Sequence, residues 1–211
     1  LRCDYKAPEE WAAFIAGLKA EPAERRTAAE GFIEPRSFIA SLSRMMHPKA
    51  VFVADVGQNQ IWSANSFETR DGVFLTSGGM GTMGYSIPAA IGAKLAKPHR
   101  EVVAVCGDGS FQMSMCELGT ICQHDIDIKI IVMKNERLGM VRELQDSLYG
   151  GRHAATILSG SPDFAKLAAA YGIPAYEADN NEDAQRMAKK MLETKGPCLL
   201  VCSVGPDTPS K

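Results

Sequence analysis

The sequence lacks most of the features that mark secreted, membrane-spanning or zinc-binding proteins. Its six cysteines form no Cys-x-x-Cys pair and have no neighbouring histidines, so they predict neither a zinc site nor a disulfide framework. No apolar run is long enough to cross a bilayer, and no signal peptide is visible at Leu1. We therefore expect reduced, mostly buried cysteines in a cytoplasmic protein without a membrane partner.

Positive charge is also scarce. The formal net charge is −2, which argues against nucleic acid as a partner because a nucleic-acid-binding face must be basic. The four histidines are scattered without metal-ligand spacing, and no internal repeat or low-complexity tract is present. With 45% hydrophobic and 23% charged residues, the 211-residue chain is typical of one folded domain, with or without an attached tail.

Apolar runs alternate with segments of helical periodicity along most of the chain. The runs that predict strands are Ala50–Ala54, Val73–Thr76, Val102–Cys106, Ile128–Met133, Ile173–Tyr176 and Cys198–Val204. The predicted helices are Ala7–Ala20, Pro35–His47, Gln60–Asn65, Ile87–Leu95, Phe111–His124, Gly139–Gln145, Asp163–Tyr171 and Asn181–Glu193, with Tyr149–Pro162 as a loop. The pattern predicts an α/β fold, a three-layer αβα domain with a mostly parallel sheet of about six strands.

The first part of the chain differs in composition from the rest. Glu21–Glu30 is a charged stretch that we interpret as a linker crossing a surface. We expect residues 1–34 to be a linker and helix connected to a preceding domain, and residues 35–211 to form the α/β domain. Because Leu1 is not an initiator methionine, we expect the chain to be a fragment of a longer one.

Polar residues follow two consecutive strands of the central unit. Gly107-Asp108-Gly109 ends one apolar run, and Lys134-Asn135 ends the next. In a parallel sheet these ends lie at the same edge, where open α/β sheets bind ligands. A carboxylate and an amide oxygen suit a hard divalent cation, and the adjacent glycines let the backbone approach a ligand closely. A helix beginning near Phe111 directs free N–H groups to the same place, which favours a bound phosphate.

A second glycine-rich segment allows a different interpretation. Gly79-Met80-Gly81-Thr82-Met83-Gly84 matches G-x-G-x-x-G after a strand and before a helix, the pattern of nicotinamide or flavin dinucleotide sites. Such a site needs an acid at the end of the next strand, and Asp108 has roughly that position. However, Asp108 lies between glycines at the start of its own helix, which describes a phosphate or metal site better than a ribose-binding site.

The spacing from Gly107-Asp108-Gly109 to Asn135 resembles the thiamine diphosphate motif. From Pro35 to Val204 the chain resembles the C-terminal, cofactor-binding domain of the acetolactate synthase large subunit. The segments that carry the resemblance are Asp55–Gln58, Thr76–Gly84, Pro88–Ala93, Gly107–Met113, Leu138–Arg142, Pro162–Phe164 and Ala170–Gly172. The resemblance makes residues 35–211 a domain that binds thiamine diphosphate and Mg²⁺.

The resemblance implies a role for each matching residue. Asp108, Asn135 and the main-chain carbonyl of Arg137 are expected to hold Mg²⁺. The diphosphate is expected to be lined by Val56, Gly57, Gln58, Asn59, Gly107, Gly109, Ser110, Leu138, Gly139 and Met140. The catalytic group is expected to comprise Gly81, Met83, Met140 and Val141. The Gly81 carbonyl would accept a hydrogen bond from the aminopyrimidine, and Met83 would hold the cofactor bent. Plain core packing is the alternative interpretation of both Met83 and Met140.

Three positions depart from the family pattern. Lys134 replaces the first of two asparagines, although the second, which is the cation ligand, remains as Asn135. Asn59 stands where the family usually has histidine. Leu144 replaces a tryptophan that shapes the second-substrate pocket, so Val141 and Leu144 are the expected pocket residues and the acceptor preference is open.

The resemblance implies condensation of two pyruvates to 2-acetolactate and CO₂ in branched-chain amino-acid biosynthesis. It implies 2-oxo acids as substrates, a homodimer or tetramer of the full-length chain, a small regulatory subunit in some members, and FAD held mainly by a middle domain. It also implies that this fragment is inactive alone, because the activating glutamate comes from another domain. The rival hypotheses are another thiamine diphosphate-dependent decarboxylase, oxidase or carboligase, a non-catalytic assembly domain, and a dinucleotide-binding oxidoreductase.

Overall fold

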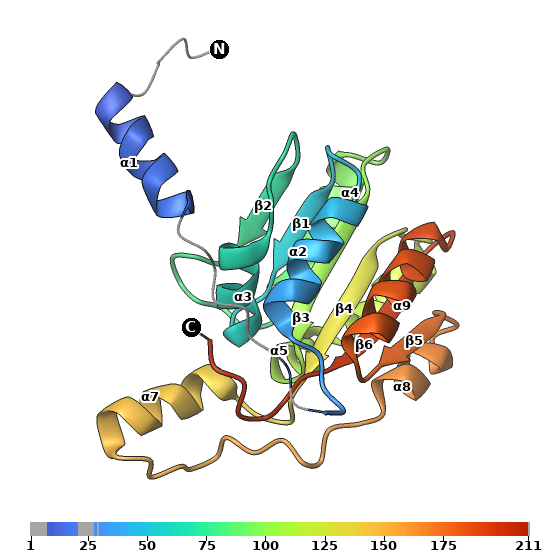
Figure 1. Ribbon diagram of the computed structural model, residues 1–211. Coiled ribbons are helices and arrows are strands. Elements are labelled where there is room, and N and C mark those ends of the chain that lie inside the picture. The colour runs from blue at the N-terminus through green and yellow to red at the C-terminus, as the bar shows by residue number, and fades with distance from the viewer. Residues whose placement is uncertain (1–7, 21–27, 29, 211) are drawn as a thin grey trace.

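A six-stranded, entirely parallel sheet forms the centre of the molecule (Figure 1). The computed structural model describes residues 8–20, 28 and 30–210. The strands are β1 (Val51–Ala54), β2 (Val73–Thr76), β3 (Val102–Gly107), β4 (Lys129–Lys134), β5 (Ala175–Ala178) and β6 (Cys198–Ser203). Their spatial order is β2-β1-β3-β4-β6-β5, which confirms the predicted α/β fold.

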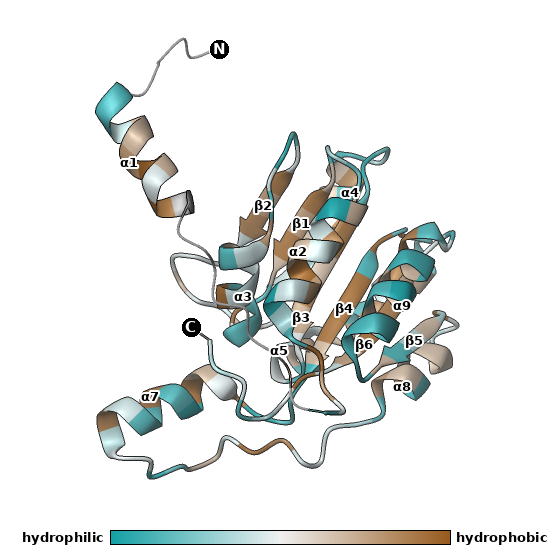
Figure 2. Ribbon diagram, in the orientation of Figure 1, coloured by the Kyte–Doolittle hydropathy of each residue, from teal (hydrophilic) through white to brown (hydrophobic). Residues whose placement is uncertain are grey.

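Helices cover both faces of this sheet and make the three layers that the alternation predicts. Those in the described residues are α1 (Glu9–Ala20), α2 (Pro35–Met45), α3 (Gln58–Ser66), α4 (Ser86–Ala96), α5 (Asp108–Ser114), α6 (Glu117–Gln123), α7 (Gly139–Tyr149), α8 (Phe164–Ala170) and α9 (Asn181–Glu193). α2, α3 and α9 pack on one face, and α4, α5, α6 and α8 on the other. Figure 2 shows apolar residues along the strands and polar residues on the outer side of α9.

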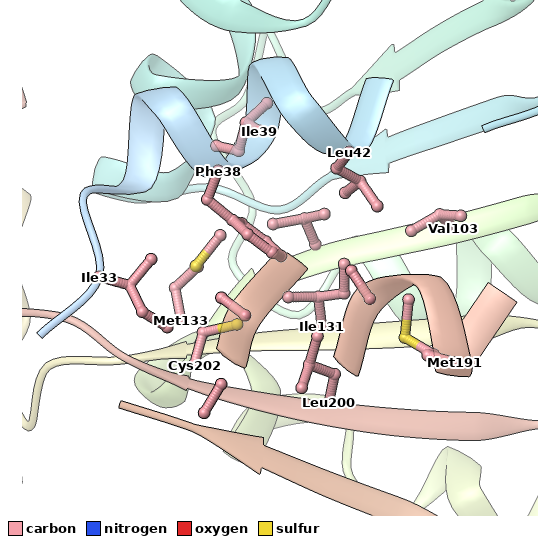
Figure 3. Close-up of a cluster of buried hydrophobic side chains, with 14 of the residues drawn as sticks. Ile33, Phe38, Ile39, Leu42, Val103, Ile131, Met133, Met191, Leu200 and Cys202 are labelled. Carbon is pink, nitrogen blue, oxygen red and sulfur yellow. The ribbon is translucent and has the colours of Figure 1, made fainter. Parts of the chain in front are cut away.

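Each face of the sheet buries its own apolar cluster. On the α2 side, Phe38 and Leu42 pack above Ile131 and Leu200, with Met191 from α9 beside them (Figure 3). These side chains are almost fully buried, and the burial of each one stabilises the fold by about 1.5–3 kcal/mol. The double-sided burial explains why β3, β4 and β6 are continuous apolar runs instead of alternating ones.

Two predicted elements of the α/β domain begin two residues away from their expected positions. α3 begins at Gln58, not Gln60, so Gln58 and Asn59 lie in its first turn. β5 begins at Ala175, not Ile173, because Pro174 has no N–H to donate to a neighbouring strand.

The helix predicted over Phe111–His124 is two helices. It begins at Asp108 and is interrupted at Met115 and Cys116, where Leu118 N–H donates to Met115 O and Gly119 N–H donates to Cys116 O. These i→i+3 bonds are typical of a tightened turn at a helix end. The earlier start places Asp108 in the first turn of α5.

The N-terminal segment is only partly described. α1 is helical as predicted, and Figure 1 shows it standing away from the sheet, with Trp11 and Phe14 exposed and their rings 5.7 Å apart. Ala7 and most of the predicted linker Glu21–Glu30 lie outside the described residues. Within the described chain, every helix is too short or too polar to span a membrane.

The strand order produces a switch point at one edge of the sheet. From β1 the chain moves outward to β2, crosses back to β3 on the other side of β1, and continues to β4. Loops that leave the carboxyl ends of β1 and β3 therefore diverge. Open α/β sheets bind their ligands in the crevice that such divergence creates.

Candidate functional site

A cavity lies at this switch point, where segments that follow β1, β2, β3 and β4 meet. Its lining comprises Val56, Gly57, Gln58, Asn59, Trp62, Gly81, Met83, Gly107, Asp108, Gly109, Ser110, Met133, Asn135, Arg137, Leu138, Gly139, Met140 and Val141. All but one of the residues predicted for the site are present. The exception is Leu144, which lies outside the lining, exposed on α7.

Asp108 is the buried carboxylate of this cavity, with 1% of its surface exposed. Its Oδ1 accepts from Gly109 N–H at 2.8 Å, and its Oδ2 accepts from Asn135 N–H at 3.2 Å and Glu136 N–H at 2.6 Å. One carboxylate thus ties the end of β3 to the loop after β4. The adjacent parallel strands bring the two predicted cation ligands, Asp108 and Asn135, to one point, as the sequence predicts.

Two opposing influences set the protonation of Asp108. Removal from water raises its pKa above the usual value, and the hydrogen bonds from Glu136, Gly109 and Asn135 N–H groups lower it, with burial dominating. A buried anion in this state gains stability from a nearby positive charge. A nearby cation would lower this pKa and stabilise the ionised carboxylate.

Asn135 is held on both sides of its amide group. Its Nδ2 donates to Gln58 Oε1 at 2.9 Å, and its Oδ1 accepts from Arg137 N–H at 3.1 Å. Glu136, between Asn135 and Arg137, has φ +56°, a left-handed backbone conformation that residues other than glycine and asparagine rarely adopt. The hydrogen bond from Glu136 N–H to Asp108 offsets this strain, which costs about 1 kcal/mol.

Two glycines in the cavity wall have no room for a side chain. A Cβ at Gly109 would lie 2.7 Å from Leu138 Cδ2, and one at Gly139 would lie 1.8 Å from Gln58 Oε1. Gly57, with φ +139°, is in a region that L residues rarely adopt. At these glycines no side chain covers the main chain that faces the cavity, and the resemblance predicts the diphosphate there.

Asp55, at the end of β1, fixes the loop that carries Gly81 and Met83. Its carboxylate accepts from Val56 N–H at 2.8 Å, Gly84 N–H at 3.0 Å and Ser86 N–H at 2.8 Å, and it is fully buried. The last two bonds lie directly after Met83. They hold the half-buried Met83 against the cavity, so core packing alone does not describe this methionine.

Two predicted diphosphate ligands already use their side-chain hydrogen-bond donors within the protein. Asn59 Nδ2 donates to Asp55 O at 2.9 Å and to Val105 O at 3.2 Å, which occupies both of its hydrogens. Ser110 Oγ accepts from Gly107 N–H at 3.0 Å and donates to Gly107 O at 3.1 Å. In this conformation the Asn59 amide hydrogens and the Ser110 hydroxyl hold the surrounding loops together, and neither side chain has a donor left for a ligand.

The segment from α7 to Leu158 forms a closed hairpin beside the cavity. Leu138 N–H donates to Thr156 O, Leu158 N–H donates to Glu136 O, and Gln145 exchanges two hydrogen bonds with Ala154. α7 starts at Gly139, as predicted, which brings Met140 and Val141 to the cavity. The hairpin leaves Leu144 and Leu148 exposed.

The chain after β6 supplies contacts that sequence reasoning missed. Gln58 Nε2 donates to Glu143 Oε1 at 2.9 Å and to Thr208 O at 2.8 Å, while Trp62 Nε1 donates to Pro209 O at 2.9 Å. Ser210 donates to both oxygens of Glu143. No periodicity or motif marks residues 205–210, so only their contacts reveal them.

The donor set fits a hard cation better than a transition metal. Among the described residues, no group of three or more His, Cys, Asp or Glu side chains could hold a metal. One carboxylate, one amide oxygen and main-chain carbonyls remain, and these are oxygen ligands of the kind that Mg²⁺ takes together with substrate phosphates. The described cysteines are free, with Cys106, Cys198 and Cys202 buried and the other two exposed.

Comparison with known proteins agrees with this geometry. The family model described as the C-terminal TPP binding domain of thiamine pyrophosphate enzymes matches residues 55–202, which include every cavity-lining residue. The chain belongs to this family. Its Gly79–Gly84 segment is therefore part of a thiamine diphosphate-binding domain, and the dinucleotide interpretation loses its basis.

Curated relatives narrow the comparison. The chain is 42% identical over 171 residues to the acetolactate synthase large subunit of Cyanidium caldarium, covering 81% of this chain and 29% of the relative. It is 37% identical over 196 residues to the isozyme 2 large subunit of Escherichia coli, covering 92% and 36%. A probable acetolactate synthase large subunit of Methanocaldococcus jannaschii is 37% identical over 210 residues, covering 96% and 36%. The chain spans about a third of the length of these relatives.

Proposed function

We propose that this chain is the cofactor-binding part of an acetolactate synthase, which joins two pyruvates to form 2-acetolactate and CO₂. The observation that carries the proposal is the cavity, where Asp108 and Asn135 share one space with Met83 and Val141. The similarity to large subunits of acetolactate synthase supports the reaction. Thiamine diphosphate, when bound, supplies an electron-accepting ring that lets a 2-oxo acid lose CO₂.

We assign roles to the chain's own residues from the resemblance and from their places in the cavity. Asp108 and the Asn135 amide oxygen would hold Mg²⁺, with the Arg137 carbonyl as the third ligand. The bared main chain at Gly109 and Gly139 would receive the diphosphate. Gly81 and Met83 would face the pyrimidine side, on a loop that Asp55 fixes.

The decisive experiment is product analysis with the full-length protein. Pyruvate, Mg²⁺ and thiamine diphosphate should yield 2-acetolactate, and omission of either cofactor should abolish the product. Acetaldehyde, acetate or an acyl thioester as the main product would support a different decarboxylase, oxidase or carboligase. Leu144 keeps such a different enzyme open as a second candidate. It stands where the family pattern has a tryptophan, and its side chain is exposed and does not line the cavity.

We further propose that the chain requires partners for catalysis. The activating glutamate of the family has no counterpart identified in this chain, so the isolated 211-residue chain should convert no pyruvate. We expect a homodimer or tetramer of the full-length protein, with FAD and a small regulatory subunit as further components to be tested by absorbance and co-purification. We also propose a cytoplasmic location, in keeping with the free state of the described cysteines.

Saturable, Mg²⁺-dependent binding separates this function from a non-catalytic assembly domain. The chain should bind thiamine diphosphate with Mg²⁺ and lose that binding with EDTA. Metal-independent binding, or none by the full-length protein, would favour the assembly domain.

A further inference from the structure

Glu143 lies on the second turn of α7, outside the cavity lining, yet it is the centre of a polar network. Its Oε1 accepts from Gln58 Nε2 at 2.9 Å and from Ser210 N–H at 2.7 Å, and its Oε2 accepts from Ser210 Oγ at 2.6 Å. A half-buried carboxylate with three acceptor contacts holds its partners firmly. Of these partners, Gln58 lines the cavity.

The contacts of Gln58 determine which way its amide faces. Its Nε2 meets two groups that can only accept, the Glu143 carboxylate and the Thr208 carbonyl. If the amide were reversed, its oxygen would face two acceptors and both hydrogen bonds would be lost. Gln58 therefore presents Oε1 to Asn135.

The same logic passes to Asn135. Because Gln58 offers an oxygen, Asn135 must turn its Nδ2 toward Gln58, at 2.9 Å. Its Oδ1 then faces the other side, where Arg137 N–H confirms it as the acceptor at 3.1 Å. A reversed Asn135 would place Nδ2 against Arg137 N–H and would offer a cation an N–H₂ group, which cannot bind it.

We propose that Glu143 is a positioning residue that, through Gln58, orients the Asn135 amide so that its oxygen faces the cation site. The proposal rests on the proposed function, because it needs a cation at Asp108 and Asn135. The space allows little alternative, since Gln58 lies against Gly139 so closely that a Cβ there would be 1.8 Å from Oε1. Partners of metal ligands of this kind commonly change metal affinity 10–100-fold when removed.

Substitutions at Glu143 separate orientation from packing or charge. Glu143→Ala removes the acceptor and should weaken Mg²⁺ binding about 10-fold in the presence of thiamine diphosphate. Glu143→Gln should retain most of the affinity, since its Oε1 can still accept from Gln58 and Ser210 N–H while its Nε2 donates to Ser210 Oγ. Titration calorimetry of the full-length protein with MgCl₂ measures both.

Two variants serve as matched controls. Ser210→Ala removes one contact of Glu143 but leaves its bond to Gln58, so Mg²⁺ affinity should change less than about 3-fold. Asp146→Asn removes a negative charge from the same helix, where Asp146 pairs only with the His153 side chain at 2.6 Å among the described residues. It should leave Mg²⁺ affinity unchanged.

A change at Asn135 itself tests the orientation directly. Asn135→Asp presents oxygen on both sides, so the ligand no longer depends on which way the group faces. In that background the further change Glu143→Ala should cost less than about 2-fold in Mg²⁺ affinity, a non-additive result diagnostic of coupled residues.

The outcomes are distinguishable. Equal Mg²⁺ affinity of wild type and Glu143→Ala, or a 10-fold loss that persists in the Asn135→Asp background, overturns the positioning of Asn135. A Glu143→Gln variant as weak as Glu143→Ala overturns it too, because charge would then be what matters. A wild-type protein without Mg²⁺-dependent thiamine diphosphate binding overturns the proposed function itself.

Discussion

The carboxyl ends of β1 and β3 are built on the same plan and differ in what they do. Each ends in a buried aspartate, Asp55 or Asp108, that accepts a hydrogen bond from the next residue and two more from the loop after the neighbouring strand. Asp55 joins the end of β1 to the loop after β2, and Asp108 joins the end of β3 to the loop after β4. Asp108 lines the cavity and Asp55 does not.

The difference shows that burial and hydrogen bonding do not by themselves identify a ligand. Both carboxylates satisfy three N–H groups, which is enough to explain a buried aspartate. What distinguishes Asp108 is the open space beside it and the amide of Asn135 across the loop. Asp55 is a structural residue that positions Met83, whereas Asp108 is both structural and available to a cation.

The largest expected effect separates the two ends directly. Asp108→Asn should weaken Mg²⁺-dependent thiamine diphosphate binding by on the order of 100-fold or more, because it removes the only carboxylate predicted to bind the cation. The free energy of unfolding of the metal-free protein should change by only about 1 kcal/mol, since a lost hydrogen bond and the removal of a buried charge oppose one another. Calorimetry and urea unfolding measure the two quantities. A variant that binds normally would show that Asp108 is no ligand.

The corresponding change at β1 should act on stability instead. Asp55→Ala leaves three N–H groups without their acceptor and should lower the free energy of unfolding by about 3 kcal/mol. Mg²⁺ should not restore it. Urea unfolding with and without MgCl₂ is the measurement, with Asp71→Ala, at an exposed position in the bend before β2, as a surface control. If Mg²⁺ binding stabilised Asp55→Ala far more than wild type, the assignment of the two aspartates would be wrong.

The pH dependence of stability sharpens the contrast. Burial raises the pKa of Asp108. At pH values between its pKa in the unfolded chain and its raised pKa in the folded protein, the metal-free folded protein therefore holds a proton that the unfolded chain releases. Its contribution to the free energy of unfolding is therefore fully present below the usual pKa of 3.8 and is lost as the pH rises through the raised pKa. The difference between the unfolding free energies of wild type and Asp108→Asn should therefore fall as the pH rises over that range. Saturating Mg²⁺ should abolish the fall, and a difference that rises with pH in metal-free buffer would contradict it.

The smallest effect concerns the strained residue between the two cation ligands. Glu136→Gly relieves the left-handed conformation at φ +56° while keeping the N–H that donates to Asp108. The free energy of unfolding should rise by up to about 1 kcal/mol, and Mg²⁺ affinity should stay within about 3-fold of wild type. Thermal unfolding checks the first and calorimetry the second. A large loss of affinity would show that the Glu136 side chain itself contributes.

Much of the fold could be predicted because it depends on local patterns. Continuous apolar runs marked β3, β4 and β6, since strands buried on both faces have no polar side. The start of β5 was wrong by two residues because Pro174 has no N–H to donate to a neighbouring strand, although its carbonyl still accepts from Leu199 N–H. The break between α5 and α6 left no sequence signal. Asp108 and Asn135 were predicted from their places after two strands, a position that adjacent pairing then confirmed.

Other features depended on contacts across the chain. Leu144 was expected in a substrate pocket from its place in a motif, but the helix turns it outward, so that prediction stays untested. Glu143 and Ser210 were not predicted, because they are separated by 67 residues and meet only when the tail crosses α7. Asn59 and Ser110 were expected to face a phosphate, and that prediction stays untested. The structure adds that the amide hydrogens of Asn59 and the hydroxyl of Ser110 bond to the main chain.

The sequence by itself determined the layered α/β fold, the edge of the sheet where a ligand binds, and the residue types that a cation and a diphosphate need there. Those features follow from hydrophobic periodicity and from chemistry carried by short segments. Only the tertiary structure decided which way the amides of Gln58 and Asn135 face and which distant residues hold them. Donor and acceptor pairing requires both partners in place, and the chain brings them together only when it folds.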